Sequence, residues 1–455
     1  MIMEDSYMLL SNCQISSYKI MKQIGSGAYG LVFHVADIFS NANFAMKVIL
    51  KSHLFHLPKN VKKTEILLNQ LLHDLSKNDY KLSLSSVDLE SIVTMTDIQL
   101  ETNPQYKELQ LHLKVHSHPN VVTIHQVMES NFATFIIMDY YPTDLFTSIV
   151  DDKHFTQDGA LVKKAMIQLS SVLEYCSLLN VYHCDLKPEN ILLDKFDNLY
   201  LCDFGLATTS KTLDPNICIG SSYYMAPERI NIVGNEYSGL NSYKTVKGDI
   251  WSLGILLINL TCIRNPWAKA SITEDKTFAY FIKNPTILQK ILPVSNELLS
   301  LLMKILVLDP IDRIPYEQIR QEIINIQSFT LDGPLSKVEP MEQSFLQHSI
   351  STGTVIPSTT TRDGATTSNV SSSSSSSTNQ TVLFDDTIDK ADYLDYSRTT
   401  TPCDSDLYFK NYQTHKTNSN SNSNSDEYNH ELKNTLLQYE MNLTNFQSSN
   451  EFLQF

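Results

Sequence analysis

The segment YHCDLKPENILL, residues 182–193, constrains this chain more than any other stretch of its sequence. It places a carboxylate, an ammonium and an amide within six residues, at Asp185, Lys187 and Asn190, and Asp203 follows thirteen positions later in CDFGLA. Carboxylate and amide oxygens are the ligands that Mg²⁺ prefers. A further carboxylate can accept the proton of a hydroxyl, and an ammonium can neutralise a transferred phosphoryl group. These residues therefore predict a phosphoryl-transfer site: Asp185 is the base, Lys187 neutralises charge, and Asn190 and Asp203 bind the metal ion.

Three glycines near the N-terminus suggest where the phosphates would lie. Gly25, Gly27 and Gly30 stand in GSGAYGLV, and glycine lets a backbone fold closely over phosphate groups. The pattern is weak alone, because a structural hairpin or a dinucleotide-binding turn would have the same residues. A dinucleotide-binding turn should open a helix, however, and the stretch that follows here, LVFHVADI, reads as a strand.

Lys47 lies among apolar residues in the next predicted strand, NFAMKVIL. A lysine in such surroundings is costly unless its ammonium has a partner, and nucleotide phosphates together with a carboxylate would supply one. The alternative is an exposed lysine at a sheet edge, and the strand by itself does not separate the two interpretations.

The order of predicted elements favours a sheet-rich region followed by a helical one. Alternation and β-branched content predict strands over 18–25, 31–38 and 43–50. Long apolar helices are predicted later, over 159–180 and 248–262. Residues 51–104 interrupt this pattern with no clear period, although 62–75 is expected to be partly helical.

The ordered motifs GSGAYG, AMK, HCDLKPEN, DFG, APE, DIWSLG and DR resemble those of the eukaryotic protein kinases. The resemblance covers residues 18–325 and implies an α+β, bilobal protein-kinase fold. A small antiparallel β-rich N-lobe would carry the αC helix, and a larger α-helical C-lobe would follow, with ATP in the cleft between them. Residues 51–104 would be an insertion before αC. The context of Lys187 implies a serine/threonine-specific enzyme acting on protein substrates.

The resemblance assigns further residues by matched position. Lys47 would bind phosphates and pair with Glu108 of αC, while Glu228 with Arg313 and Asp249 would be structural. The residues expected to contact ATP are Ile24, Gly25, Ser26, Gly27, Ala28, Tyr29, Gly30, Val32, Ala45, Lys47, Glu108, Asp139, Tyr141, Asp144 and Leu192. The metal ion would be Mg²⁺.

A narrower resemblance is to fungal nutrient-response kinases of the glucose-signalling suppressor and meiosis-inhibitor types, carried by KELQLHLKVHSHPNVVTIHQVMES, MDYYPTDLFTSIVDDKHF and ICIGSSYYMAPE. Two departures from the general kinase pattern stand out. Cys184 replaces an arginine common before the base, which bears on regulation, and 61 positions separate Lys47 from Glu108, which bears on where a partner would dock. The competing hypothesis is a pseudokinase scaffold that binds nucleotide and acts through its insertion and tail.

Composition limits the partners and the compartment. A net charge of −15 argues against nucleic acid, because phosphate backbones are bound by basic surfaces. The seven cysteines are scattered and unpaired in pattern, and no apolar run reaches the length of a membrane span. We expect a monomeric kinase in the cytoplasm or nucleus, with regulatory partners for the insertion or tail. The Ser/Thr/Asn-rich tail, residues 333–455, is predicted to be mostly disordered.

Overall fold

A computed structural model describes residues 10–11, 13–27, 30–51, 63–155, 159–215, 217–230 and 242–331. These residues belong to one compact unit. The expected disordered tail, residues 333–455, lies outside the described residues.

The N-terminal lobe is built on a sheet of eight described strands in the order β5-β1-β2-β3-β4-β8-β7-β6. All neighbours pair antiparallel except β1 with β5. The three strands predicted from the sequence are present as β2, β3 and β4. The bounds are β1 Gln14–Ile15, β2 Tyr18–Ser26, β3 Gly30–Asp37, β4 Asn43–Leu50, β5 Lys81–Leu82, β6 Ser85–Val87, β7 Ile124–Glu129 and β8 Ala133–Asp139.

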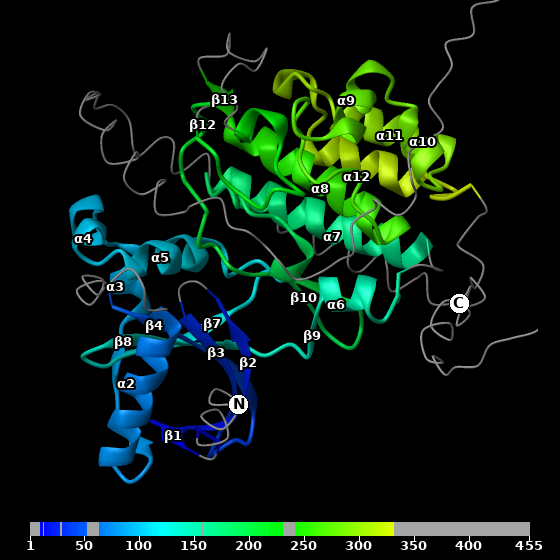
Figure 1. Cartoon of the computed structure of the whole chain (residues 1–455). Helices are drawn as coiled ribbons and strands as arrows, with labels where there is room; N and C mark the ends of the chain where they lie inside the picture. The colour runs from blue at the N-terminus through cyan, green and yellow to red at the C-terminus, as the bar shows by residue number, and fades with distance from the viewer. Residues whose placement is uncertain are drawn as a thin grey trace, which may run out of the picture. The chain divides into compact units, whose positions relative to one another are not determined.

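Helix α2 (Lys63–Lys77) covers one face of this sheet (Figure 1). Leu67, Leu71 and Leu75 recur every four residues along it, so that they form one apolar stripe, and all three are buried. They share a hydrophobic cluster with Phe33 and Phe135 of the sheet. The helix confirms the partly helical expectation for residues 62–75. Much of the region expected as an insertion is therefore core of this lobe.

The opposite face of the sheet is covered by α3 (Leu89–Val93), α4 (Asp97–Thr102) and α5 (Gln105–Val115). Their apolar residues cluster with Ile124, Val127 and Ile136. Because strand side chains alternate between faces, Ile136 points to α5 whereas its neighbours Phe135 and Ile137 point to α2. Helix α5 has the position expected of αC and carries Glu108 in its first turn.

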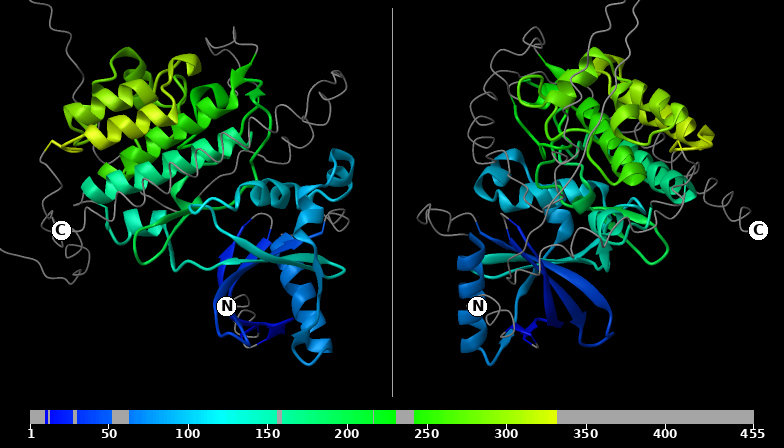
Figure 2. Two further views of the ribbon diagram at one scale, coloured as in Figure 1. Left: turned by 180° about the vertical axis from the view of Figure 1, so that it is seen from behind. Right: turned by 45° about the vertical axis from the view of Figure 1, so that its right-hand side comes forward.

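The C-terminal lobe is mainly helical, as Figures 1 and 2 show. Its core lies around α7 and α8, and α8 is apolar on nearly every side because the other helices surround it. The helices predicted over 159–180 and 248–262 are confirmed by these two. The bounds are α6 Leu145–Val150, α7 Gly159–Leu178, α8 Thr245–Cys262, α9 Lys276–Lys283, α10 Ile287–Ile291, α11 Asn296–Ile305 and α12 Tyr316–Asn325.

Short elements carry the motif residues between these helices. They are β9 Thr143–Asp144, η2 Pro188–Asn190, β10 Ile191–Leu193, β11 Leu199–Leu201, β12 Thr212–Leu213, η3 Pro227–Arg229, β13 Tyr243–Lys244 and η4 Pro310–Asp312. The small sheet β11-β10-β9 holds the segment from Asp185 to Asp203 as a hairpin on the lobe. Among the described residues, no helix combines the length and apolar character needed to cross a membrane.

Candidate active site

Lys47 and Glu108 form an ion pair between the sheet and α5. Lys47 Nζ lies 2.5 Å from Glu108 Oε1 and 3.5 Å from Asp203 Oδ1, and the side chains of Lys47 and Glu108 are each 17% exposed. Burial lowers the pKa of Lys47, but the carboxylates of Glu108 and Asp203 more than offset this and hold that pKa above its ordinary value. The ammonium is therefore charged, and it joins three segments that are far apart in the sequence.

The expected base, Asp185, is held by three side chains. Its Oδ1 accepts a hydrogen bond from Ser221 Oγ at 2.8 Å, and its Oδ2 lies 2.9 Å from Lys187 Nζ. Asn190 Nδ2 donates to the backbone oxygen of Asp185 at 2.8 Å and to its Oδ2 at 3.3 Å. Lys187 Nζ also donates to Ser221 Oγ at 3.1 Å. The residues of the segment 182–193 thus converge as their spacing predicts, and Ser221 bridges Asp185 and Lys187.

Asp203 begins the DFG segment in a left-handed backbone conformation, with φ 62°. Its side chain is 49% exposed. The positive charge of Lys47 lowers the pKa of Asp203 by more than partial burial raises it. Cys202 N donates to the backbone oxygen of Asn190 at 3.0 Å, which brings the segment carrying Asp203 beside the one carrying Asn190. A carboxylate and an amide oxygen are ligands that a hard divalent cation prefers. The Nδ2 atom of Asn190 bonds to Asp185, so its amide oxygen is the atom left for such an ion.

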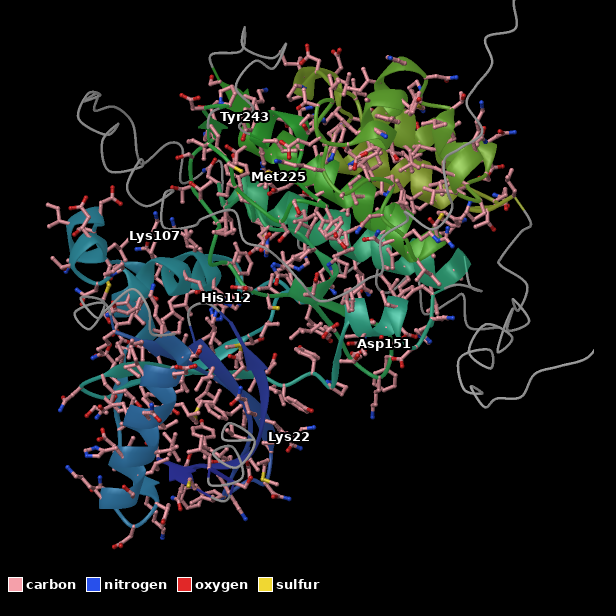
Figure 3. The ribbon with its side chains drawn as sticks, viewed as in Figure 1. Lys22, Lys107, His112, Asp151, Met225 and Tyr243 are labelled. Carbon is pink, nitrogen blue, oxygen red and sulfur yellow. The ribbon has the colours of Figure 1, made fainter. Side chains whose placement is uncertain are left out.

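Phe204 packs between two histidines from different lobes. Its ring centroid lies 5.1 Å from that of His183 and 4.8 Å from that of His112, which is on α5 (Figure 3). Burial lowers the pKa of His112 to about 3, so the ring is neutral, and its Nε2 lies 2.7 Å from the oxygen of Val122. Sequence reasoning did not identify His112 as a site residue. Its place one helical turn after Glu108 was the available signal.

The described glycines of the glycine-rich stretch lie at the end of β2 and at the start of β3. Gly27 N donates to Gly30 O at 3.0 Å, and a Cβ on Gly30 would lie 2.2 Å from the carbonyl oxygen of Val48. Gly30 is therefore required for the close approach of two strands, independently of any nucleotide. Ile24, Gly25 and Ser26 end β2. The remaining predicted loop residues, Ala28 and Tyr29, lie outside the described residues.

The residues expected around the adenine come from three strands. Val32 pairs with Lys47 between β3 and β4, Ala45 pairs with Met138 between β4 and β8, and Leu192 is on β10. The structure therefore brings the N-lobe members of this set onto adjacent strands. Leu192 comes from the C-terminal lobe and is paired there with Asp144.

The polar residues expected to contact nucleotide already have partners. Asp139 accepts from His125 at 2.6 Å, and Tyr141 stacks on Tyr200 with ring centroids 4.0 Å apart. Asp144 caps α6, accepting from Thr147 N at 2.7 Å. A contact of these residues with a nucleotide would therefore use their backbone groups or the remaining carboxylate oxygens.

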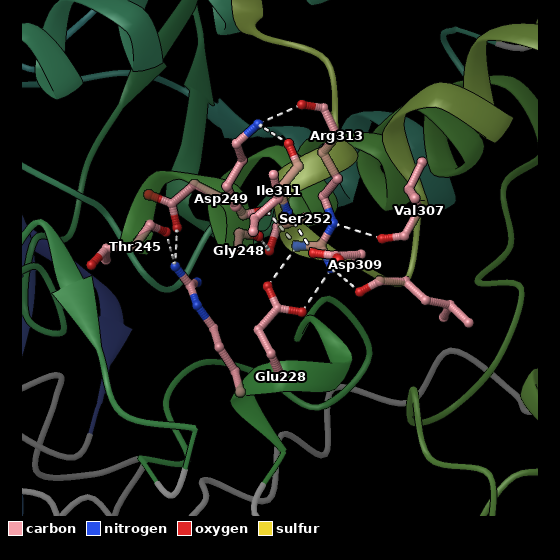
Figure 4. A network of polar contacts seen from close by, with 12 residues as sticks. Glu228, Thr245, Gly248, Asp249, Ser252, Val307, Asp309, Ile311 and Arg313 are labelled. Atoms are coloured by element: carbon pink, nitrogen blue, oxygen red, sulfur yellow. Dashed lines mark hydrogen bonds and ion pairs between the residues drawn. The ribbon is translucent and has the colours of Figure 1, made fainter. Parts of the chain in front are cut away.

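Asp249, Glu228 and Arg313 belong to a buried polar network (Figure 4). Asp249 connects this network to the loop that carries Asp185, here called the catalytic loop. Asp249 accepts from the backbone nitrogens of His183 at 2.9 Å and Cys184 at 3.1 Å. Arg313 binds Glu228 through two bonds of 2.5 and 2.7 Å. These are the structural contacts that the family resemblance implies, and none of these side chains reaches the reacting groups.

One member of this network was not expected. Arg229, directly after Glu228, is buried with its Nη2 atom 3.0 Å from Asp249 Oδ1. Burial lowers the pKa of Arg229, but the acidic groups of Cys184, Asp249, Tyr243 and Glu228 more than offset this and keep that pKa above its ordinary value. The sequence contains a weak indication that Arg229 is buried and paired. Arg229 directly follows Glu228, which was expected to be buried, and a buried charge needs a partner.

Comparison with known proteins agrees with this geometry. Residues 87–323 match the family described as protein kinase domain. The serine/threonine-protein kinase SKS1 of Saccharomyces cerevisiae is 52% identical over 346 residues, which cover 72% of this chain and 69% of that protein. The serine/threonine-protein kinase VHS1 of the same yeast is 49% identical over 357 residues, covering 76% and 77%.

A more distant relative is the negative regulator of sexual conjugation and meiosis of Schizosaccharomyces pombe. It is 32% identical over 346 residues, which cover 72% of this chain and 64% of that protein. With the fold and the ordered motifs, these matches show that the chain belongs to the protein kinase family. It is a serine/threonine protein kinase, and as a member of that family it uses ATP and a divalent metal ion to phosphorylate proteins.

Proposed function

We propose that this kinase is catalytically active, with Asp185 as the base that accepts the proton of the acceptor hydroxyl. The observation that carries the proposal is the position of its carboxylate, which Ser221 and Lys187 contact at 2.8 and 2.9 Å. A base must be held in one orientation to act on a bound hydroxyl. The Lys47–Glu108 pair and the ionised Asp203 support the same proposal.

The metal ion in this proposal is Mg²⁺, held by Asn190 and Asp203. Mg²⁺ takes oxygen ligands and keeps several waters, so two protein oxygens together with phosphate oxygens make a sufficient set. When bound, the ion would neutralise charge on the phosphates. Lys47 would bind the phosphate oxygens from the N-terminal lobe. Lys187, 2.9 Å from Asp185, would neutralise charge near the acceptor as the phosphoryl group arrives.

The nucleotide would lie between the two lobes. Val32 and Ala45 on one side and Leu192 on the other would enclose the adenine, with backbone groups of Asp139 and Tyr141 as its polar partners. The residues from Ile24 to Gly30 would cover the phosphates, and the second carboxylate oxygen of Asp144 is available for the ribose. Two pairings support this assignment. Val32 and Ala45 are on the adjacent strands β3 and β4, and Leu192 pairs with Asp144 in the small sheet of the C-terminal lobe.

The assay that tests activity uses the purified full chain, Mg·ATP and a general protein substrate, with the Asp185→Asn variant as the control. Phosphate transfer on serine and threonine that disappears in the variant is the expected result. Tight ATP binding without transfer by the unaltered chain would instead support a scaffold acting through residues 51–104 and 333–455.

We further propose that the kinase favours substrates with arginine N-terminal to the phosphorylated residue. Burial raises the pKa of Glu189, and its Oε2 atom is buried without a hydrogen-bond partner among the described residues. A substrate guanidinium would satisfy this oxygen and, with the nearby Asp144, form a charge-assisted contact. A peptide library should show enrichment of arginine upstream of the acceptor, and Glu189→Gln should reduce that enrichment. If arginine is not enriched upstream of the acceptor, the proposed preference is wrong, but the proposed kinase activity is not affected.

The cellular role that we propose is in fungal nutrient or glucose response. It rests on the similarity to SKS1 and VHS1 and on a relative named as a regulator of conjugation and meiosis. We propose a monomer that acts in the cytoplasm or nucleus, without nucleic-acid partners. The chain, but not its Asp185→Asn variant, should change the growth of yeast cells lacking both SKS1 and VHS1 when glucose is limiting. An equal change with both would assign the role to a non-catalytic function.

We propose residues 18–325 as the catalytic domain, the 51–104 segment as its insertion, and residues 333–455 as a regulatory tail. Cys13, Ile15 and Phe329 are buried in the cores of the two lobes, so an expressed fragment should include them. A fragment of residues 10–331 should retain activity toward a general substrate. Partner capture that depends on residues 333–455 would identify the tail as the regulatory part.

A further inference from the structure

Arg229 lies beneath the catalytic loop and is 1% exposed. Its Nη2 atom is 3.0 Å from Asp249 Oδ1 and donates to the backbone oxygen of Thr245 at 2.7 Å. Figure 4 shows Asp249 and Thr245 in this network, next to the Glu228–Arg313 pair. A buried guanidinium is costly unless it is paired and hydrogen-bonded, so its position here is fixed by these partners.

The partners of Arg229 are also the groups that hold the catalytic loop. Asp249 is the acceptor for the backbone nitrogens of His183 and Cys184. In addition, Nη1 of Arg229 lies 3.5 Å from the carbonyl oxygen of Cys184. The guanidinium therefore contacts the residue directly before Asp185, and it also contacts the carboxylate that orients that residue's backbone.

Cys184 needs such support because its backbone has φ 63°, in the left-handed region that side-chain-bearing residues rarely adopt. Its carbonyl oxygen also lies close to the segment between Asp203 and Glu228, here called the activation segment, because a Cβ on Gly220 would be 2.7 Å from it. The strained residue thus presents its carbonyl to Gly220 and to Arg229, and the peptide that leads into Asp185 has little freedom to rotate.

Helix α8 makes room for this arginine with a glycine. A Cβ on Gly248 would lie 2.1 Å from Nε of Arg229 and 2.2 Å from its Cζ. Any side chain at position 248 would displace the guanidinium from Asp249. Gly248 and Asp249, both labelled in Figure 4, are adjacent on α8. The glycine leaves space for the guanidinium, and the carboxylate pairs with it.

We propose that Arg229 is a positioning residue for phosphoryl transfer, which fixes Asp249 and the Cys184 carbonyl so that Asp185 is aimed at the acceptor hydroxyl. Gly248 is the residue that accommodates it. The proposal rests on the proposed function of Asp185 as the base. It also links the end of the activation segment, through the buried Arg229–Asp249 ion pair, to the carboxylate that holds the backbone of Cys184, a residue whose side chain carries no charge.

The first test is Arg229→Lys, which keeps the charge but loses the planar head that reaches Asp249, Thr245 and Cys184 together. We expect kcat to fall about tenfold or more while KM for ATP changes less than about twofold, because nucleotide contacts are untouched. The matched control is Arg320→Lys on α12, where the guanidinium pairs with Glu174 and donates to the carbonyl oxygen of Ser170 on α7. It should leave kcat within about twofold of the wild-type value.

The second test measures coupling between positions 229 and 248. Gly248→Ala should lower kcat about tenfold in the wild-type background, but less than about threefold in the Arg229→Lys background, where no guanidinium head occupies the space. Effects that simply multiply would overturn the proposal. So would an unchanged kcat in Arg229→Lys, or a loss of ATP affinity that parallels the loss of kcat. If Asp185→Asn is inactive while Arg229→Lys is fully active, this inference alone fails; turnover by Asp185→Asn would remove the proposed function itself.

Discussion

The two sides of the active site hold their charged groups by different means. On the N-terminal lobe, Lys47 has one close carboxylate partner, Glu108 on α5 at 2.5 Å, and a longer contact to Asp203. On the C-terminal lobe, Asp185 is contacted by Ser221, Lys187 and Asn190. The loop that carries Asp185 is in turn anchored by buried Asp249.

This difference indicates where the site is easy to disturb. Removing one of several contacts leaves Asp185 restrained by the others, whereas losing Glu108 leaves Lys47 with only the longer contact to Asp203, 3.5 Å away. Helix α5 is bonded to the end of α3 within the same lobe. Gln110 Nε2 of α5 donates to the carbonyl oxygens of Val93 at 3.1 Å and Met95 at 2.8 Å. Loss of one supporting contact should therefore reduce activity more on the N-terminal side, at Glu108, than on the C-terminal side, at Ser221.

The largest effect should come from the reacting group itself. Asp185→Asn removes the proton acceptor and should lower kcat by about 10²–10⁴-fold, while ATP affinity measured by calorimetry stays near the wild-type value. Asp197→Asn is the matched control, because Asp197 is in the turn between β10 and β11 and pairs with exposed His154. Near-normal turnover by Asp185→Asn would contradict the assignment of the base.

A smaller loss is expected on the N-terminal side. Glu108→Gln removes the negative charge of the closest partner of Lys47, so phosphate positioning should suffer and kcat/KM for ATP should fall about tenfold to hundredfold. Steady-state kinetics with varied ATP measure this, and Glu101→Gln on exposed α4 is the control. A loss below about threefold would show that the Lys47 side is as redundant as the Asp185 side.

On the C-terminal side, Ser221→Ala tests redundancy directly. One hydrogen bond to Asp185 is lost, and Lys187 and Asn190 remain, so kcat should fall only about threefold to tenfold. Ser222→Ala, at the adjacent position, controls for effects on the segment. If Ser221→Ala were as damaging as Asp185→Asn, the three contacts would act as one unit and the proposed contrast between the two sides would be wrong.

The smallest effect should come from removing phosphate from the activation segment. Between Asp203 and Glu228 the only basic residue is Lys211, and Cys184 adds no charge beside the base. The buried cation nearby, Arg229, is already paired with Asp249. Phosphatase-treated enzyme of confirmed unmodified mass should show initial rates within about twofold of untreated enzyme, with no lag. Activity that appears only after phosphorylation of this segment would refute the expectation.

Local sequence predicted much of the fold and the grouping at the site. The strands 18–26, 30–37 and 43–50 and the helices 159–178 and 245–262 follow from periodicity within each segment. The convergence of Asp185, Lys187 and Asn190 followed from their close spacing, because six residues of one loop cannot lie far apart. For the interrupted region 51–104, periodicity indicated only part of one helix, since its other elements are short and depend on the sheet they cover.

The sequence by itself determined which chemical groups are present and in what order, and these already indicate phosphoryl transfer by a protein kinase. Only the tertiary structure decided that α2 and α5 cover opposite faces of one sheet and that His112 contacts Phe204. It also decided that Arg229 packs against Gly248 and pairs with Asp249. The physical reason is that a side chain's type is local, whereas the burial of a charge and the identity of its partner are set by residues that only folding brings together.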